Sequence, residues 1–321
     1  MRAVVRSRYG GPGVLALAEV DAPSAAAGEV LIRVEAVAVS MGDVLVLHGE
    51  PRIARLAFGL RRPKHPVIGR DVAGVVAAVG PGVTRFRVGE AVFAESDQGG
   101  FAELAAVPER FVARRPTSVD AVHAAAVVVS GTTALQAMRL AAVAPGRHLL
   151  VNGASGGVGG FAVQLAKAMG AEVTGVCRGA KAEHVRALGA DHVIDYLTDD
   201  FTAHEGRYDA ILDLVADHSL ARTRRALRRG GTLVLSSGRG GRVLGPIGRI
   251  AAASVASPFV PQHLRTLAAR RSGDDLAELA RRVDAGELRP VVDAVFPLDR
   301  AADAVARLES GQVRGKVVIA V

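Results

Sequence analysis

The 321-residue sequence predicts an α/β protein with a doubly wound parallel sheet and a second, β-rich domain. Three observations lead to this prediction. A glycine-rich turn follows an apolar run at residues 148–151. The middle of the chain alternates strand-length apolar runs with segments of helical spacing, the pattern of a parallel sheet with right-handed crossovers. The first third has short apolar or alternating runs separated by glycine and proline turns, which is typical of β-rich structure.

The expected elements follow in order along the chain. In the first third, strands are expected at residues 4–5, 30–39, 72–79 and 91–93. In the middle third, helices are expected at 121–142, 159–169, 181–188 and 220–228, alternating with strands at 149–151, 173–177, 192–194, 210–214 and 232–236. After Pro290, strand-like residues 291–296 and 317–321 flank a helix at 301–308. A Gly/Arg-rich loop at 238–248 lies close behind a strand end, where open α/β sheets carry their ligands.

Composition restricts the class of protein. The length suggests about two domains, and 50% hydrophobic residues can supply a sizeable core. No run of 18 or more apolar residues free of charges is present, so no transmembrane helix is expected. The first residues lack the long apolar stretch of a signal peptide, and the single cysteine, Cys177, excludes an internal disulfide. We therefore expect a cytoplasmic protein.

The basic charge balance does not indicate nucleic-acid binding. The net charge is +8, but only four of the 40 basic residues are lysines, so 36 are arginines spread along the whole chain. Aromatic residues, which stack on bases, make up only 4% of the sequence, and tryptophan is absent. We expect no nucleic-acid partner.

The glycine-rich turn carries the first chemical prediction. It reads Ala154-x-Gly156-x-x-Gly159 between an apolar run and a segment of helical spacing. This is a dinucleotide fingerprint with alanine in its first glycine slot, in which backbone N–H groups and a helix N-terminus bind a pyrophosphate. The phosphate loop predicted here consists of Ala154, Ser155, Gly156, Gly157, Val158 and Gly159.

The end of the next expected strand indicates which dinucleotide binds. NAD-binding units place Asp or Glu there, about 20 residues beyond the glycines, to bind the ribose 2′-hydroxyl. This chain has Arg178 in that slot and Lys181 three residues later. Because two cations attract a 2′-phosphate, the sequence favours NADPH/NADP⁺ over NAD(H).

At this point the chain resembles a known family, the zinc-free, quinone oxidoreductase-like branch of the medium-chain dehydrogenase/reductase superfamily. The resemblance runs nearly end to end. It rests on residues 40–43 (SMGD), 66–80 (PVIGRDVAGVVAAVG), 87–92 (RVGEAV), 99–103 (GGFAE), 131–134 (GTTA), the glycine turn, 187–196 (ALGADHVIDY) and 315–318 (GKVV).

The resemblance implies a domain organisation. A GroES-like substrate domain is expected from residues 1–118 and 289–321, and a Rossmann NADP(H)-binding domain from residues 119–288. A cleft between the domains and, commonly, a homodimer are also implied.

The resemblance also indicates which residues act. Lys181 and Tyr196 match positions that hold the 2′-phosphate in quinone reductase relatives, although Tyr196 could instead pack in the core. Zinc-dependent relatives have Cys and His ligands where this chain has Ser40 and Arg70, and the structural zinc loop is missing. Because a guanidinium does not bind a divalent cation, no metal is expected.

Loss of zinc restricts the chemistry. Zinc would stabilise developing alkoxide charge, whereas a quinone or α,β-unsaturated carbonyl needs only a few hydrogen-bond donors at its oxygen. The expected function is therefore reduction of a quinone or enone by NADPH. Two alternatives stay open: a pathway-specific enoyl reductase of natural-product biosynthesis, and a non-catalytic NADPH-binding sensor or RNA-binding protein.

The remaining candidate residues each have two interpretations. Ser40 could donate to a substrate carbonyl or serve as a turn residue, and His48 competes with water as proton donor. For Asp43 a structural salt bridge is favoured over a catalytic role. Thr132 could cap a helix or contact the nicotinamide ribose. Ser236 and Ser237 end an expected strand beside the nicotinamide.

Overall fold

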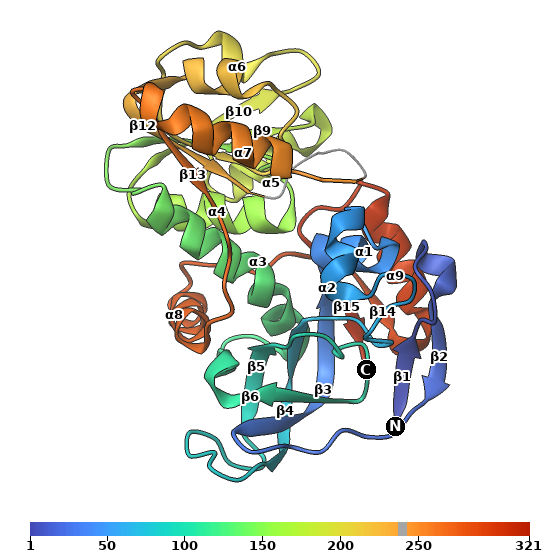
Figure 1. The fold of residues 1–321 in the computed structure, drawn as a ribbon. Coiled ribbons are helices and arrows are strands. Elements are labelled where there is room, and N and C mark those ends of the chain that lie inside the picture. Colours follow the sequence, from blue (N-terminus) through green and yellow to red (C-terminus); the bar gives the residue numbers. More distant parts are fainter. Residues whose placement is uncertain (237–242) are drawn as a thin grey trace. The chain divides into compact units, whose positions relative to one another are not determined.

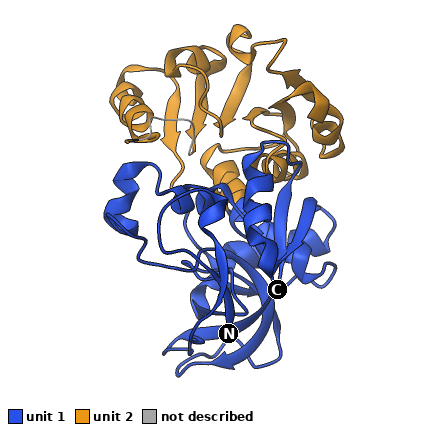
Figure 2. Cartoon of the chain, turned by 90° about the vertical axis from the view of Figure 1, so that its right-hand side faces the viewer, with its two compact units in different colours: residues 1–132, 270–321 blue, residues 133–269 orange. Residues whose placement is uncertain are grey.

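The computed structural model describes residues 1–236 and 243–321. The chain divides into two compact units (Figure 2). Unit 1 comprises Met1–Thr132 and Arg270–Val321, and unit 2 comprises Thr133–Ala269. The domain ranges expected from the sequence differ from these units, because they assign residues 119–132 and 270–288 to the nucleotide-binding domain. The units describe compactness only, so the division into a substrate domain and a nucleotide-binding domain stays a prediction.

Unit 1 is built around an open sheet of mostly antiparallel strands (Figure 1). Within the described residues the sheet has seven strands in the order β14-β15-β3-β4-β5-β7, and β6 also pairs with β3. Only the β14–β15 pair is parallel. The strands are β3 (Glu29–Val39), β4 (Asp71–Val79), β5 (Ala91–Glu95), β6 (Leu104–Pro108), β7 (Val112–Arg114), β14 (Val292–Pro297) and β15 (Lys316–Ala320), and a separate hairpin joins β1 (Arg2–Val5) to β2 (Ala16–Glu19).

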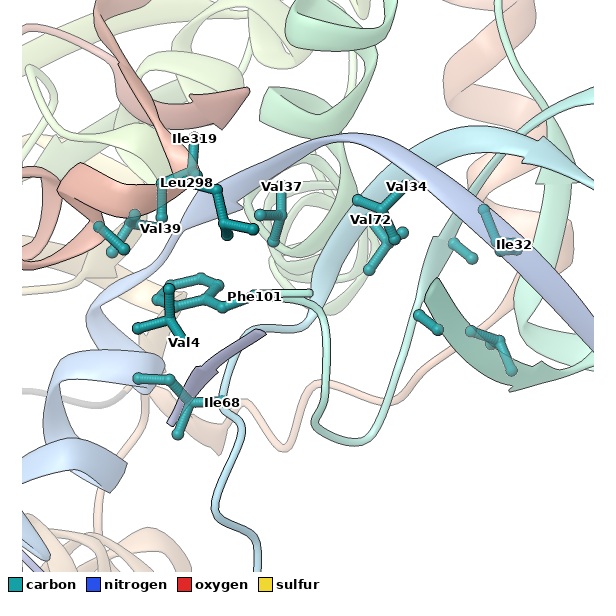
Figure 3. Packing of buried hydrophobic residues seen from close by; sticks show 14 of the residues in the cluster. Val4, Ile32, Val34, Val37, Val39, Ile68, Val72, Phe101, Leu298 and Ile319 are labelled. Atoms are coloured by element: carbon teal, nitrogen blue, oxygen red, sulfur yellow. The ribbon is translucent and has the colours of Figure 1, made fainter. Parts of the chain in front are cut away.

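Alternating side chains of these strands form the core of unit 1. Along β3, Val30, Ile32 and Val34 are buried at every second position, as a strand with one face on a core requires. Figure 3 shows Phe101 among Val4, Ile68 and Leu298 of the same cluster. Gly69 makes this packing possible, because a Cβ there would lie 2.3 Å from the Phe101 ring. Ile68 and Val72, two residues on either side of Arg70, are both fully buried in this core.

Short helices complete unit 1. The helices α1 (Met41–His48) and α9 (Ala301–Glu309) are in contact, and α8 (Gly273–Asp284) packs against β7. The remaining elements are α2 (Arg55–Phe58), η1 (Pro12–Val14), η2 (Arg52–Ala54), η3 (Glu109–Phe111) and η7 (Leu298–Arg300).

Unit 2 is a six-stranded parallel sheet within the described residues, which confirms the predicted α/β class. Its strand order is β10-β9-β8-β11-β12-β13, the 3-2-1-4-5-6 order of a doubly wound dinucleotide-binding fold. The strands are β8 (His148–Asn152), β9 (Glu172–Cys177), β10 (His192–Asp195), β11 (Tyr208–Asp213), β12 (Leu227–Leu235) and β13 (His263–Thr266). The order reverses between β8 and β11, so the topological switch point lies at Asn152 and Asp213, which are paired in register.

Helices connect the strands of unit 2, with some departures from expectation. They are α4 (Gly157–Ala168), α5 (Ala182–Ala187), α6 (Leu220–Arg225) and α7 (Ile247–Ala256), with η4 (Gly179–Lys181), η5 (Phe201–Ala203) and η6 (Ser257–Phe259). The prediction that the helix at 220–228 continues past Arg225 is wrong, because Leu227 instead pairs with Tyr208 in the sheet and is buried there. Residues 247–248 of the expected loop begin α7.

The helix α3 (Ala121–Leu140) is the longest element described. Among the described residues, one helix, α3, is long and apolar enough to cross a membrane when only its length and composition are considered. However, 67% of its most apolar stretch is buried inside the fold, and core helices of globular proteins pass the same test. Length and composition are therefore weak evidence for a membrane span.

Candidate active site

The predicted phosphate loop, residues 154–159, comprises the end of the turn after β8 and the first residues of α4. Helix α4 begins at Gly157 after the N-cap Gly156, whose position provides no side-chain cap for the first N–H groups. A Cβ at Gly159 would lie 2.1 Å from the Gly153 carbonyl oxygen, so the turn closes only with glycine there. An uncapped helix N-terminus behind a tight glycine turn is chemically suited to a pyrophosphate.

The predicted 2′-phosphate residues follow the ends of two neighbouring strands, β9 and β10. Arg178 directly follows β9 and is exposed, and Lys181 ends η4. Tyr196 directly follows β10, and its N–H donates to the Cys177 carbonyl at 3.2 Å. Its side chain is 51% exposed, which excludes the core-packing interpretation. Parallel strands bring these three residues to the same edge of the sheet.

One acidic residue near this edge was missed by the sequence analysis. Asp195 ends β10, and a Cβ at Gly179 would lie 2.3 Å from its Oδ2 atom. Its carboxylate therefore lies against the turn that follows Arg178. The signal was available, because Asp195 directly precedes Tyr196 in the quoted motif.

A second missed group lies at the switch point; we call Asn152, Asp213, Asp217 and Arg249 the switch-point cluster. Asn152 Nδ2 donates to Asp213 Oδ1 at 2.9 Å and to Asp217 Oδ1 at 3.0 Å. Arg249 of α7 pairs with Asp213 Oδ2 at 2.7 Å. Ser236 follows β12, and its N–H donates to the Asp213 carbonyl at 3.3 Å. Ser237 lies outside the described residues.

In unit 1, Ser40 lies in a buried polar network with Asp43, Asp71 and Lys316, here called the Ser40 cluster. Lys316 Nζ donates to Ser40 Oγ at 2.7 Å and to Asp71 Oδ2 at 3.0 Å. The Ser40 hydroxyl donates to Asp71 Oδ2, and the Val129 N–H of α3 donates to Asp71 Oδ1 at 2.9 Å. Lys316 and Asp71 are 3% and 0% exposed, so this ion pair is screened from water.

Asp43 fixes the backbone of this cluster. Its Oδ2 accepts the Ser40 N–H at 2.8 Å, which caps the start of α1. Among the described residues Asp43 forms this cap rather than the salt bridge that we favoured, and its buried Oδ1 has no hydrogen-bond partner. Burial, together with the smaller effect of the nearby Asp71 carboxylate, raises the pKa of Asp43 to about 7.

His48 and Thr132 differ in how well the structure suits their predicted roles. His48 ends α1 eight residues after Ser40, a rise of about 12 Å, and its Nε2 pairs with Glu309 Oε1 of α9 at 2.6 Å. Thr132 lies inside α3, so the capping interpretation is wrong, because the helix begins eleven residues earlier. Its buried Oγ1 has no hydrogen-bond partner within the described chain.

The position that matches a second zinc ligand in relatives holds Arg70, whose Nη2 pairs with Glu95 Oε1. A guanidinium engaged with a carboxylate offers no lone pair to a metal. Within residues 1–236 and 243–321, no group of three or more His, Cys, Asp or Glu side chains could hold a metal ion.

Comparison with known proteins decides the family. Residues 26–117 match the family described as alcohol dehydrogenase GroES-like domain, and residues 188–319 match zinc-binding dehydrogenase. The chain is 32% identical over 338 residues to the chloroplastic quinone-oxidoreductase QR1 of Triphysaria versicolor, covering 99% of this chain and 98% of the relative. The chain belongs to the medium-chain dehydrogenase/reductase superfamily, in its quinone oxidoreductase-like branch.

Other relatives extend this result. A chloroplastic NADPH-dependent alkenal/one oxidoreductase of Arabidopsis thaliana is 31% identical over 99% of this chain and 79% of its own length. A segment comprising 5% of the polyketide synthase GfsB of Streptomyces halstedii is 34% identical over 92% of this chain.

Solved structures agree with the fold. The quinone oxidoreductase from Coxiella burnetii has a TM-score of 0.88 at 27% identity, covering 100% of this chain and 99% of that one. A mycobacterial protein complexed with NADPH has a TM-score of 0.84 at 28% identity, with both chains fully covered. The superfamily therefore supplies a GroES-like domain, a Rossmann domain and an oxidoreductase chemistry related to quinone and alkenal/one reduction.

Proposed function

We propose that this chain reduces a quinone or an α,β-unsaturated carbonyl with NADPH and without zinc. The occupation of the two positions that carry zinc ligands in relatives supports this most strongly. Ser40 is hydrogen-bonded to Lys316 and Asp71, and Arg70 is paired with Glu95. The side chains present supply hydrogen-bond donors and cations rather than metal ligands.

The residues at the edge of the parallel sheet fit NADPH. The uncapped N-terminus of α4 would hold the pyrophosphate, and Arg178, Lys181 and Tyr196 would hold the 2′-phosphate. When bound, the reduced nicotinamide supplies the hydride. The NADPH bound to the mycobacterial neighbour and named for the Arabidopsis relative supports the same cofactor here.

The acceptor class follows from the demands of the reaction. Hydride addition to the β-carbon of an enone, or to a quinone, leaves negative charge on an oxygen that hydrogen-bond donors can stabilise. The Ser40 hydroxyl is our proposed donor. For the final proton, water and His48 are the proposed sources, and the contact of His48 Nε2 with Glu309 Oε1 favours water.

A panel of acceptors tests this proposal. Oxidation of NADPH would be measured with 1,4-benzoquinone, 9,10-phenanthrenequinone and an alkyl enone, beside NADH and with a chelator present. We expect turnover with NADPH that is weaker with NADH and unchanged by the chelator. Loss of activity with chelator would overturn the zinc-independent part of the proposal.

The match to the polyketide synthase segment favours a second candidate, a pathway-specific enoyl reductase of natural-product biosynthesis. Turnover of thioester-linked enones with no turnover of simple quinones would support it. NADPH binding with no turnover of any acceptor would instead support a non-catalytic NADPH-binding sensor, or an RNA-binding protein if RNA also bound. We also propose a cytoplasmic homodimer, which sedimentation and cell fractionation would test.

A further inference from the structure

Lys316 is a buried cation that the function proposed above does not use. It begins β15, which lies between β14 and β3 in the sheet. Its ammonium group donates both to Ser40 Oγ and to Asp71 Oδ2. Burial of an ammonium group is costly, and each of its three N–H donors then needs an acceptor inside the protein. Because one of those acceptors is Ser40 Oγ, the cation is coupled directly to the Ser40 hydroxyl.

The hydrogen bonds around Ser40 show what Lys316 changes. The Ser40 hydroxyl proton points to Asp71 Oδ2, so it is not directed at a substrate. Asp71 also receives the Lys316 ammonium on Oδ2 and the Val129 N–H on Oδ1. If the hydroxyl rotates away, Asp71 keeps both of these donors and Ser40 Oγ keeps its bond from Lys316. Rotation then leaves no charge unpaired.

We propose that Lys316 is a positioning residue that releases the Ser40 hydroxyl from Asp71, so that it can donate to the oxyanion of the reduced acceptor. This inference rests on the proposed function. The electron pair displaced as hydride reaches the β-carbon moves onto the acceptor oxygen, where the Ser40 proton is shared but stays on Oγ. Water supplies the proton that completes the product. The ammonium also polarises the hydroxyl, which strengthens it as a donor.

The rival explanation is that Lys316 only balances the charge of Asp71. Both explanations expect Lys316→Gln to lower stability, because a buried carboxylate loses its partner. They differ in the coupling to Ser40. If Lys316 acts through the hydroxyl, its replacement has no further effect on turnover once that hydroxyl is removed.

A double-mutant cycle of S40A and K316Q tests this on the full chain, with the best acceptor from the panel. We expect S40A to lower kcat by about 10²-fold, as for loss of one oxyanion donor. K316Q should lower kcat by about tenfold in the wild-type background and by less than about twofold in S40A. K316R, which keeps the cation, should recover part of the loss. NADPH affinity, measured by nicotinamide fluorescence, should stay unchanged throughout.

The inference would be overturned if the kcat losses of S40A and K316Q multiplied in the double variant. It would also be overturned if S40A kept the full kcat of the wild type. Should K316Q fail to fold, the neutral pair K316Q/D71N replaces it, because D71N removes the charge that holds the Ser40 proton. In that pair kcat should fall by no more than about tenfold, because only the polarising ammonium is lost, and S40A should still cost about 10²-fold. A larger loss in the folded pair would refute the release mechanism. A wild-type chain inactive with every acceptor would instead refute the proposed function.

Discussion

The phosphate loop of unit 2 and the Ser40 cluster of unit 1 present polar groups by opposite means. The phosphate loop offers backbone N–H groups, and glycine at position 159 allows the turn to close. The Ser40 cluster offers buried side chains whose charges balance within a few ångströms. The phosphate loop should therefore be disrupted by substitutions that add atoms to its glycines, more than by changes of charge. The Ser40 cluster should be disrupted by substitutions that change a charge. Four substitutions test that contrast, from the largest expected effect to the smallest.

The Ser40 cluster should make the stability of the protein depend on pH, through the carboxyl group of Asp43. Its folded pKa of about 7 lies above the unfolded value of about 3.9, so the folded state binds the proton more tightly. The free energy of unfolding should then fall as pH rises from about 4 to about 7 and level off above, a change on the order of 2–4 kcal/mol. Asp43→Asn, which keeps the cap on Ser40, should flatten this slope in denaturant titrations. An unchanged slope would show that Asp43 ionises freely.

The phosphate loop should lose its conformation when a methyl group is added at Gly159. The new Cβ would lie 2.1 Å from the Gly153 oxygen and 2.8 Å from the Ala154 Cα. We expect Gly159→Ala to lower stability by about 1–3 kcal/mol and to weaken NADPH binding. Gly156→Ala is the matched control, because its Cβ would lie 3.5 Å from the same oxygen. Equal stability losses in the two variants would contradict the close approach at Gly159.

The charge of Lys181, which follows β9, should affect cofactor affinity, because the 2′-phosphate is expected there. Lys181→Ala should weaken NADPH binding by about tenfold, because a charge-assisted hydrogen bond is lost. Binding of NADH, which lacks the phosphate, is the control and should change little. Fluorescence titration with both cofactors measures the difference, and a parallel loss for NADH would place Lys181 elsewhere than at the 2′-phosphate.

Asp195, at the end of β10, should weaken NADPH binding at the same edge of the sheet. Its carboxylate lies against the Gly179 turn, next to Arg178, and would repel a nearby phosphate. Asp195→Asn should therefore raise NADPH affinity by about threefold and leave NADH affinity constant or lower. Because the residue is partly exposed, the effect should shrink as salt is added. An unchanged ratio of the two affinities would remove Asp195 from cofactor selection.

The two sites also differ in how far the sequence could predict them. The phosphate loop and the alternation of strands and helices are local patterns, so residues 148–169 indicated both the parallel sheet and its ligand edge. Ser40 lies 276 residues from Lys316, and Asp71 lies 245 residues from it. No periodicity relates such positions. Lys316 was therefore interpreted only as part of a terminal motif until the sheet brought β15 next to β3.

Other gaps have local or long-range causes. The capping interpretation of Thr132 was avoidable, because Asp120 directly precedes the run of helical spacing at 121–142 and is a strong N-cap residue. The His48–Glu309 pair and the Asp213–Arg249 pair each join separate elements, so they depend on packing rather than on local spacing.

The placement of β15 has a consequence for the synthesis of this protein. Residues 133–269 are contiguous, so unit 2 can begin to fold while the ribosome is still translating the rest. Unit 1 must wait, because β15 lies between β14 and β3 and is translated only after all of unit 2. Until then Asp71 lacks its ammonium partner. A chain cut short before residue 316 would keep unit 2 and lack the cation of the Ser40 cluster, so the nascent protein would form its parallel sheet before its buried ion pair.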